Sequence, residues 1–268
     1  PKLLFYKGEK EIVGEIGDTY TDPDYQRKGM FSLLINQTRR DAESEGISFI
    51  YGTPNEQSLP GYEKKANFKI IKSIYVNSMS FPVNISPIIS RKTHWLLGNL
   101  IGYFYLILIL SIQKFKKLIN KTDLIEEIIV AKNIPENWDI FWNKAHKAHD
   151  FIFSRDSKAL IWRFINHPNS YKIYYIRRGK EIIGYLSYRI LHGNGITNLV
   201  IADYLFLKGK EKKLQSILNR VLKDSIQEKV TTIKVWCPHD SPYFKIFRDF
   251  GFMSRGNIPV ICYQNEFA

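Results

Sequence analysis

The chain has 268 residues, 44% of them hydrophobic, which is enough for one large domain or two ordinary domains with real cores. The two cysteines, Cys237 and Cys262, are too few and too far apart for a disulfide framework or a zinc site. They exclude a disulfide-stabilised scaffold and favour a reducing, cytoplasmic compartment.

The charge balance points to an acidic partner. Lys and Arg number 39 against 26 Asp and Glu, a formal net charge of +13. Such a balance suits a coenzyme polyphosphate, a nucleic acid or an anionic membrane surface. Because the lysines are scattered along the chain, a Lys- and Ile-rich composition alone explains the charge equally well.

The first informative segment joins a strand to a helix through a loop suited to holding a phosphate. Residues 12–21 carry β-branched and aromatic side chains that predict a strand, and Pro23 ends it. Apolar side chains recur at helical spacing from Phe31 onward. Gly29 lets the backbone approach a ligand, and the first turn of the helix offers unpaired N–H groups and a positive dipole end to an anion.

A second segment follows that helix at a characteristic spacing. Residues 47–52 predict a short strand, which leads to Asn55 and, seven residues later, to Tyr62. The two segments together resemble the core of the GNAT acetyltransferase superfamily, whose loop reads Gln/Arg-x-x-Gly-x-Gly/Ala. The matching positions in this chain are Gln26, Gly29, Phe31, Asn55 and Tyr62. Phe31 departs from the pattern, because the family usually has a small residue there.

The resemblance covers residues 2–80 and implies a mixed sheet flanked by helices, with acetyl-CoA as cosubstrate and no metal. It implies that the backbone near Tyr20 and Thr21 pairs with the pantetheine arm, that Asn55 holds that arm, and that Tyr62 is the general acid. Tyr62 could instead be a core aromatic. Backbone amides of the loop would bind the pyrophosphate; they belong to Arg27, Lys28, Gly29, Met30, Phe31 and Ser32.

The general base is a separate question. Alternation along the predicted strand places Asp18, Tyr20 and Asp22 on one face. The carboxylate of Asp18 could accept a proton directly or through water, or it could only order the loop. The resemblance also implies that residues 2–21 are the third and fourth strands of such a fold, so we expect the earlier elements to lie outside this chain.

The middle of the chain changes character. Residues 95–112 form an uncharged run of 18 residues, bracketed by Arg91 and Lys92 on one side and by Lys114, Lys116 and Lys117 on the other. This length is at the threshold for a membrane span. Asn99 and two glycines also suit a buried helix or a helical hairpin on a membrane surface, and we expect one of these two arrangements in place of a span.

Residues 125–268 predict a second α/β unit. Asp156 is expected to cap a helix that ends before Pro168, and residues 171–189 alternate around Arg178-Gly179-Lys180 as in a β-hairpin. The remaining predicted elements are strands at 127–132, 196–206, 231–237 and 259–264 and helices at 136–149, 211–227 and 242–250. This order again resembles a GNAT fold. The segment from Arg155 to Pro168 resembles one found in GNAT proteins associated with bacterial surface-polysaccharide synthesis.

We therefore predict an α/β fold of two tandem GNAT-like units: a partial, motif-bearing domain at 1–81, an apolar helical linker at 82–124, and a degenerate domain at 125–268. The second unit lacks the glycine spacing in residues 205–213. It has Asp240 and Phe247 where Asn and Tyr would fall. Phe247 cannot donate a proton and Asp240 would repel a polyphosphate, so we expect one coenzyme site, in the first unit.

The resulting function hypothesis is an acyl-CoA-dependent N-acyltransferase, in particular one that acetylates an amino group of a small molecule or sugar. Membrane-surface contact through residues 95–112 is an expected partner interaction, and nucleic acid is not. Two alternatives remain: a Fem-type aminoacyl transferase that uses charged tRNA, and a non-catalytic membrane-docked binding module.

Overall fold

The computed structural model describes residues 1–17, 19–119 and 126–264, which form two compact units. Unit 1 comprises Pro1–Asn77, His149–Ser154 and Gly256–Ala268, and unit 2 comprises Ser78–Ala148 and Arg155–Arg255. This division differs from the sequence-based boundaries at 81 and 124. The apolar segment groups with unit 2, and two later segments group with unit 1, because their strands pair there.

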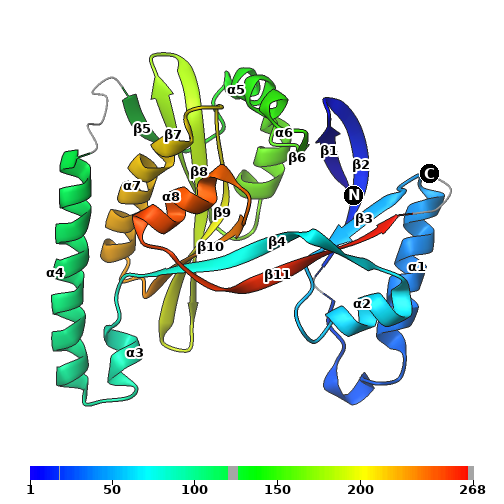
Figure 1. Cartoon of the computed structure of the whole chain (residues 1–268), viewed down its shortest axis with the longest axis horizontal. Coiled ribbons are helices and arrows are strands. Elements are labelled where there is room, and N and C mark those ends of the chain that lie inside the picture. The colour runs from blue at the N-terminus through cyan, green and yellow to red at the C-terminus, as the bar shows by residue number, and fades with distance from the viewer. Residues whose placement is uncertain (18, 120–125, 265–268) are drawn as a thin grey trace. The chain divides into compact units, whose positions relative to one another are not determined.

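Unit 1 contains a mixed sheet in the order β4-β11-β3-β2-β1-β6 (Figure 1). The strands are β1 (Lys2–Tyr6), β2 (Glu9–Ile16), β3 (Phe49–Gly52), β4 (Lys69–Pro82), β6 (Phe151–Phe153) and β11 (Met253–Gln264). A tight turn joins β1 and β2, which pair antiparallel, and β6 pairs antiparallel with the other edge of β1. On the other side, β3 pairs parallel with β2 and antiparallel with β11. Two segments distant in sequence thus complete the sheet.

The helices of unit 1 are the short 3-10 turn η1 (Pro23–Tyr25), α1 (Met30–Ser44) and α2 (Leu59–Ala66). Residues from both α-helices share one core with β3, β11 and the chain around them: Ile35, Ile47, Ile50, Tyr62, Ala66, Phe68 and Ile261. This core fixes the start of α1 and the middle of α2 beside the β2–β3 pair.

Unit 2 contains a sheet in the order β5-β7-β8-β9-β10-β4. Its strands are β5 (Glu126–Ala131), β7 (Lys172–Arg178), β8 (Glu181–Gly193), β9 (Ile196–Phe206) and β10 (Thr232–Pro238), with the end of β4. β5, β7, β8 and β9 are antiparallel neighbours, whereas β10 runs parallel to β9. The β9–β10 pair therefore corresponds to the β2–β3 pair of unit 1.

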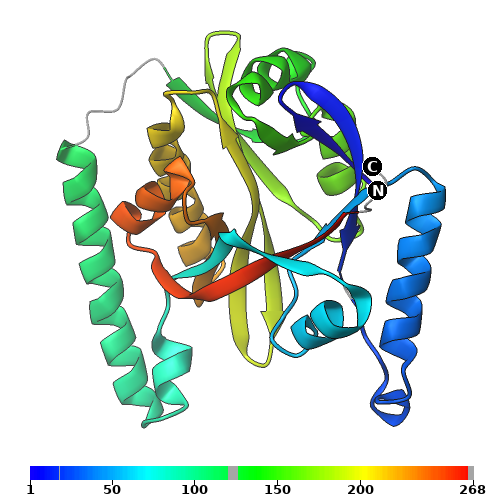
Figure 2. The ribbon, with the colours of Figure 1, turned by 45° about the vertical axis from the view of Figure 1, so that its right-hand side comes forward.

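The helical elements of unit 2 are α3 (Ser86–Ser90), α4 (Trp95–Ile119), α5 (Trp138–Ala145), η2 (His146–Ala148), α6 (Ser157–Leu160), η3 (Ile161–Ile165), η4 (Glu211–Lys213), α7 (Leu214–Gln227) and α8 (Pro242–Phe250) (Figure 2). One large apolar core includes residues of β7 to β10, α7 and α8, together with Ile109 of α4. The predicted cap is confirmed, since Asp156 Oδ1 accepts a hydrogen bond from the Ala159 N–H at 2.8 Å.

Most predicted elements of both units are present, with two differences of consequence. The predicted strand at 12–21 is too long, because β2 ends at Ile16 where its pairing with Gly52 of β3 ends. β3 itself ends at Gly52, so it offers no further residue to extend the pairing of β2. Of the two arrangements expected for residues 95–112, the structure contradicts the buried helix, since only 17% of the apolar window within Trp95–Lys114 is buried. The membrane-surface arrangement stays a prediction.

Candidate functional site

The ends of β2 and β3 define the candidate site in unit 1. These parallel strands pair from Gly14 with Ile50 to Ile16 with Gly52, and both then stop. A Cβ at Gly52 would lie 2.8 Å from the carbonyl oxygen of Ile16, so glycine permits this close approach. Each strand then enters a loop that leads to a helix, α1 after β2 and α2 after β3.

The loop after β2 is held by its own polar side chains. Asp22 Oδ1 accepts from the Asp24 N–H at 3.0 Å and caps η1. The Gln26 side chain donates from Nε2 to the Thr21 carbonyl at 3.2 Å. The Gln26 side chain therefore orders the loop that precedes the Gly29 turn.

The turn into α1 has the geometry of an anion site. Gly29 has a left-handed φ of +81°, and the helix begins directly after it at Met30. The first backbone bond of this turn runs from the Leu33 N–H to the Gly29 carbonyl at 3.0 Å. The N–H groups of Met30, Phe31 and Ser32 precede that bond and lack an intrahelical acceptor. Together with the helix dipole they can hold a phosphate oxygen.

Phe31 fits at the helix start because of a glycine on α2. A Cβ at Gly61 would lie 2.6 Å from Cε1 of Phe31, so the ring occupies space that only glycine leaves open. The Phe31 ring also packs edge-on against the Tyr62 ring, with 5.1 Å between the ring centroids. The bulky residue thus packs between α1 and α2.

Tyr62 combines a buried ring with a hydroxyl at the open end of the strands. The residue is 2% exposed, and its ring lies edge-on to Phe68 at 5.3 Å. Its hydroxyl is 3.1 Å from Oγ1 of Thr19, in the loop after β2. Burial raises the pKa of Tyr62, and the Thr19 contact lowers it by less. The phenol is therefore protonated at neutral pH and faces the loop that carries the turn into α1.

Asn55 orders the loop before α2. Its Oδ1 accepts from the N–H groups of Gln57 at 3.1 Å and Ser58 at 2.9 Å, an Asx-type turn that starts the helix. The residue is exposed. Its side-chain oxygen is thus committed to the protein, and only its amide nitrogen can reach toward a ligand.

The remaining predicted site residues lie in the loop after β2. Asp18, the predicted base, lies outside the described residues. Tyr20 is 79% exposed, and Tyr20 and Thr21 lie beyond the end of β2. Strand alternation therefore does not place Tyr20 and Asp22 on one face, because alternation applies only to residues within a strand. Arg27 and Lys28 are exposed, and Lys28 Nζ lies 4.8 Å from the centroid of the Tyr25 ring.

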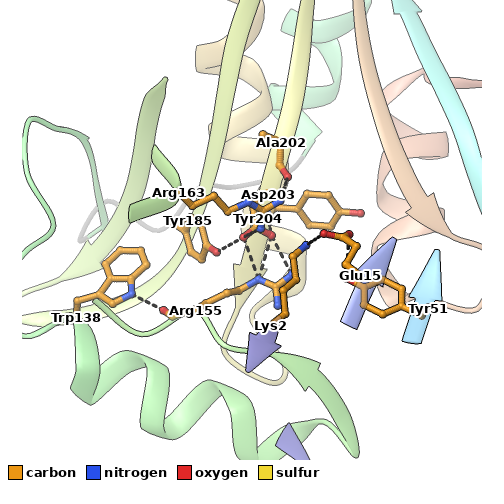
Figure 3. Close-up of polar contacts among 10 residues, drawn as sticks. All are labelled: Lys2, Glu15, Tyr51, Trp138, Arg155, Arg163, Tyr185, Ala202, Asp203 and Tyr204. Carbon is orange, nitrogen blue, oxygen red and sulfur yellow. Dashed lines mark hydrogen bonds and ion pairs between the residues drawn. The ribbon is translucent and has the colours of Figure 1, made fainter. Parts of the chain in front are cut away.

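The sequence pattern did not identify Thr19 as a partner of Tyr62, nor the polar contacts that Glu15 makes with neighbouring strands. Glu15 of β2 pairs with Lys2 of β1 and accepts a hydrogen bond from the Tyr51 hydroxyl of β3 at 2.9 Å (Figure 3). These three residues link adjacent strands across the sheet of unit 1. The alternating pattern of β2 would have placed Glu15 on a polar face, but its partners come from other strands.

The equivalent place in unit 2 is occupied by the protein itself. The Tyr204 hydroxyl donates to the Trp236 carbonyl at 3.1 Å and so bridges β9 and β10. The Tyr243 hydroxyl accepts from the Phe206 N–H at 2.9 Å, and the Glu211 carboxylate accepts from the Gly209 N–H at 3.0 Å. The Trp236 carbonyl and the N–H groups of Phe206 and Gly209 thus already have partners within the protein, and the partner of Gly209 is an anion.

The segment that begins at Arg155 is held by a buried ion-pair cluster (Figure 3). Asp203 of β9 accepts from Arg155 Nε at 3.0 Å and from the Tyr185 hydroxyl at 2.8 Å, and it pairs with Arg163 at 3.4 Å. Burial alone would raise the pKa of Asp203, but the two arginines outweigh burial and hold it below the ordinary value. The cluster anchors this segment to the sheet of unit 2.

Comparison with known proteins agrees with this arrangement. Residues 3–68 match the acetyltransferase (GNAT) family. The whole-chain fold is similar to that of a tandem GNAT protein from the clavulanic acid biosynthesis pathway, at 9% identity and a TM-score of 0.60, with 93% of this chain and 74% of that chain covered. The family match therefore covers residues of unit 1 only, and the likeness of the whole chain is one of fold. The predicted tandem GNAT fold is confirmed.

Two further structures share the GNAT fold. A GCN5-related N-acetyltransferase from Anabaena variabilis is 13% identical to this chain, with a TM-score of 0.58. The match covers 98% of this chain and 57% of that chain. Saccharomyces cerevisiae N-myristoyltransferase with bound myristoyl-CoA is 10% identical to this chain, with a TM-score of 0.65. The match covers 98% of this chain and 62% of that chain. The chain thus spans about three-fifths of the length of these two structures. No curated protein matches it.

Among the described residues, no group of three His, Cys, Asp or Glu is arranged to hold a metal ion.

Proposed function

We propose that unit 1 binds an acyl-CoA and that the chain transfers the acyl group to an amine. The observation that carries the proposal is the position of the Tyr62 hydroxyl. It lies 3.1 Å from Oγ1 of Thr19, a residue of the loop that leads into the Gly29 turn. The GNAT family match covers these same residues.

The residues of the turn fit the coenzyme. Gly29 and the first turn of α1 offer backbone N–H groups and a positive dipole end to the pyrophosphate, and exposed Arg27 and Lys28 add positive charge. No acidic residue lies in the first turn of α1. In unit 2, by contrast, the Glu211 carboxylate occupies the loop.

The chemistry needs one proton donor and one proton acceptor. The amine nitrogen attacks the thioester carbonyl, the carbon–sulfur bond breaks, and Tyr62 gives its proton to the departing thiolate. The proton of the attacking amine goes to a base, for which Asp18 remains our proposal. An acyl-enzyme intermediate is unnecessary, because the coenzyme thiol is already a good leaving group.

The acceptor is proposed as an amino group of a small molecule or sugar. The acyl chain is proposed as acetyl. The yeast N-myristoyltransferase structure holds myristoyl-CoA, so a long acyl chain is the alternative to test directly. Because the Gly29 turn suits a coenzyme pyrophosphate, we favour acyl-CoA over a charged tRNA as the donor.

Isothermal titration of the chain with acetyl-CoA, myristoyl-CoA and free CoA tests the proposal. We expect one site per chain, and a rise in melting temperature that follows ligand concentration by mass action. Gly29→Val serves as the matched control that should lose this binding. Two equal sites would contradict the assignment to unit 1, and binding of none of the three would refute an acyl-CoA function.

A further inference from the structure

Helix α4 of unit 2 exposes an unusual amount of apolar surface. The stretch Trp95–Lys114 has 20 residues and a mean hydropathy of 1.9, yet only 17% of its apolar window is buried. Soluble proteins rarely leave contiguous apolar patches of this kind without a partner. The exposed large apolar side chains are Trp95, Leu96, Leu97, Leu100, Ile101, Tyr103, Phe104, Ile107, Leu108, Leu110 and Ile112.

A single stripe of α4 packs against the rest of unit 2. The buried or half-buried positions Gly98, Gly102, Tyr105, Ile109 and Gln113 recur every three or four residues and so lie on one face of the helix. A Cβ at either glycine would collide with α3, at Ser90 or Ser86. The two helices lie side by side in both views (Figures 1 and 2).

Hydrogen bonds to backbone carbonyls hold the same stripe along its length. The Tyr105 hydroxyl donates to Pro82 at 3.1 Å, and the Gln113 side chain donates to Phe250 at 3.0 Å. Because Phe250 ends α8, which also carries exposed Arg248 and Asp249, a spanning α4 would draw these charges into hydrocarbon. The helix is therefore placed to lie along a surface and not to cross it.

The chemistry of the exposed face matches a bilayer interface. Trp95, Tyr103 and Phe104 are more than half exposed, and aromatic side chains favour the headgroup boundary. Exposed cations stand at both ends of the apolar face, Arg91 and Lys92 before it and Lys114 at its end. In a chain of net charge +13, this arrangement suits anionic headgroups.

We propose that the exposed face of α4, opposite the Gly98–Gln113 stripe, docks in the plane of an anionic lipid bilayer. The apolar side chains enter the acyl boundary while the flanking cations meet the headgroups. This inference does not rest on acyl transfer, since unit 2 carries it alone.

Flotation of the full chain with phosphatidylcholine vesicles, with and without phosphatidylglycerol, tests the proposal. We expect binding that strengthens with phosphatidylglycerol, weakens with salt and is released by carbonate. Leu100→Gln/Phe104→Gln/Ile107→Gln removes three side chains from the exposed face at constant charge. It should weaken partitioning by about 100-fold.

The matched control places the same change elsewhere on unit 2. Ile140→Gln/Trp162→Gln/Trp236→Gln also replaces three exposed apolar side chains and should leave vesicle binding unchanged. Circular dichroism of both variants checks that each is folded. Three results would overturn the proposal: carbonate-resistant insertion, equal loss in both variants, or self-association through α4 in sedimentation velocity with no vesicle binding.

Discussion

Removing the Tyr62 hydroxyl separates its chemical role from its structural one. The ring packs edge-on against Phe31 and Phe68, and Tyr62→Phe keeps both contacts. The variant loses the hydrogen bond to Thr19, which costs about 0.5–1.5 kcal/mol of folding free energy. If Tyr62 protonates the thiolate, turnover should fall by about 10²- to 10⁴-fold, while acetyl-CoA affinity in calorimetry stays near the parental value.

Thr19→Val is the control for this substitution. It removes the same hydrogen bond but keeps the phenol, so it should cost similar stability and retain turnover within about tenfold of the parent. Turnover is measured as free thiol released from acetyl-CoA with a primary amine acceptor. Parental turnover in Tyr62→Phe would reduce Tyr62 to a core aromatic. An equal loss in both variants would assign the effect to the hydrogen bond.

The pH dependence of stability has a definite sign at Tyr62. Burial raises its pKa in the folded state above the ordinary value of about 10. The protonated phenol therefore contributes stability that is fully present below about pH 10 and is lost as pH rises through the raised pKa. Tyr62→Phe lacks this contribution, so the part of the alkaline loss of stability that belongs to Tyr62 should be absent from the variant. Chemical denaturation of both proteins from pH 8 to 11 measures the difference in their free energies of unfolding.

Three further substitutions test other parts of the structure. Gly29→Val, at φ +81°, strains the turn, so acetyl-CoA affinity in calorimetry should fall at least tenfold while thermal unfolding shows that unit 1 stays folded. Gly61→Ala should cost about 1–3 kcal/mol in denaturant unfolding by forcing a Cβ against Phe31, and Phe31→Leu should relieve most of that cost; no relief would refute the packing argument. Asp203→Asn leaves the Arg155 charge buried and should cost about 3–5 kcal/mol at pH 7. Because the pKa of Asp203 is lowered, the parent's advantage should shrink as pH falls below about 4, and an advantage that is constant with pH would contradict the ion pair.

Much of the local structure follows from the sequence alone. Alternating apolar residues and turn signals predict the strand at 196–206 and the helix at 242–250 with the observed bounds, because each element's period is written in its own residues. The spacing of Gly29, Asn55 and Tyr62 likewise marks the segment that the GNAT family match covers. These features depend on short-range chemistry, which a single sequence displays.

Only the tertiary structure decides the features that depend on residues far apart in the chain. The end of β2 at Ile16 is set by the length of β3, and the β3 sheet edge is completed by β11 from the far end of the chain. Phe31 is accommodated by Gly61, and the exposure of α4 follows from a packed stripe that faces α3 and the core of unit 2. Contacts between residues that are far apart in the chain determine these outcomes. The local sequence patterns of β2, α1 and α4 do not specify which distant residues make those contacts.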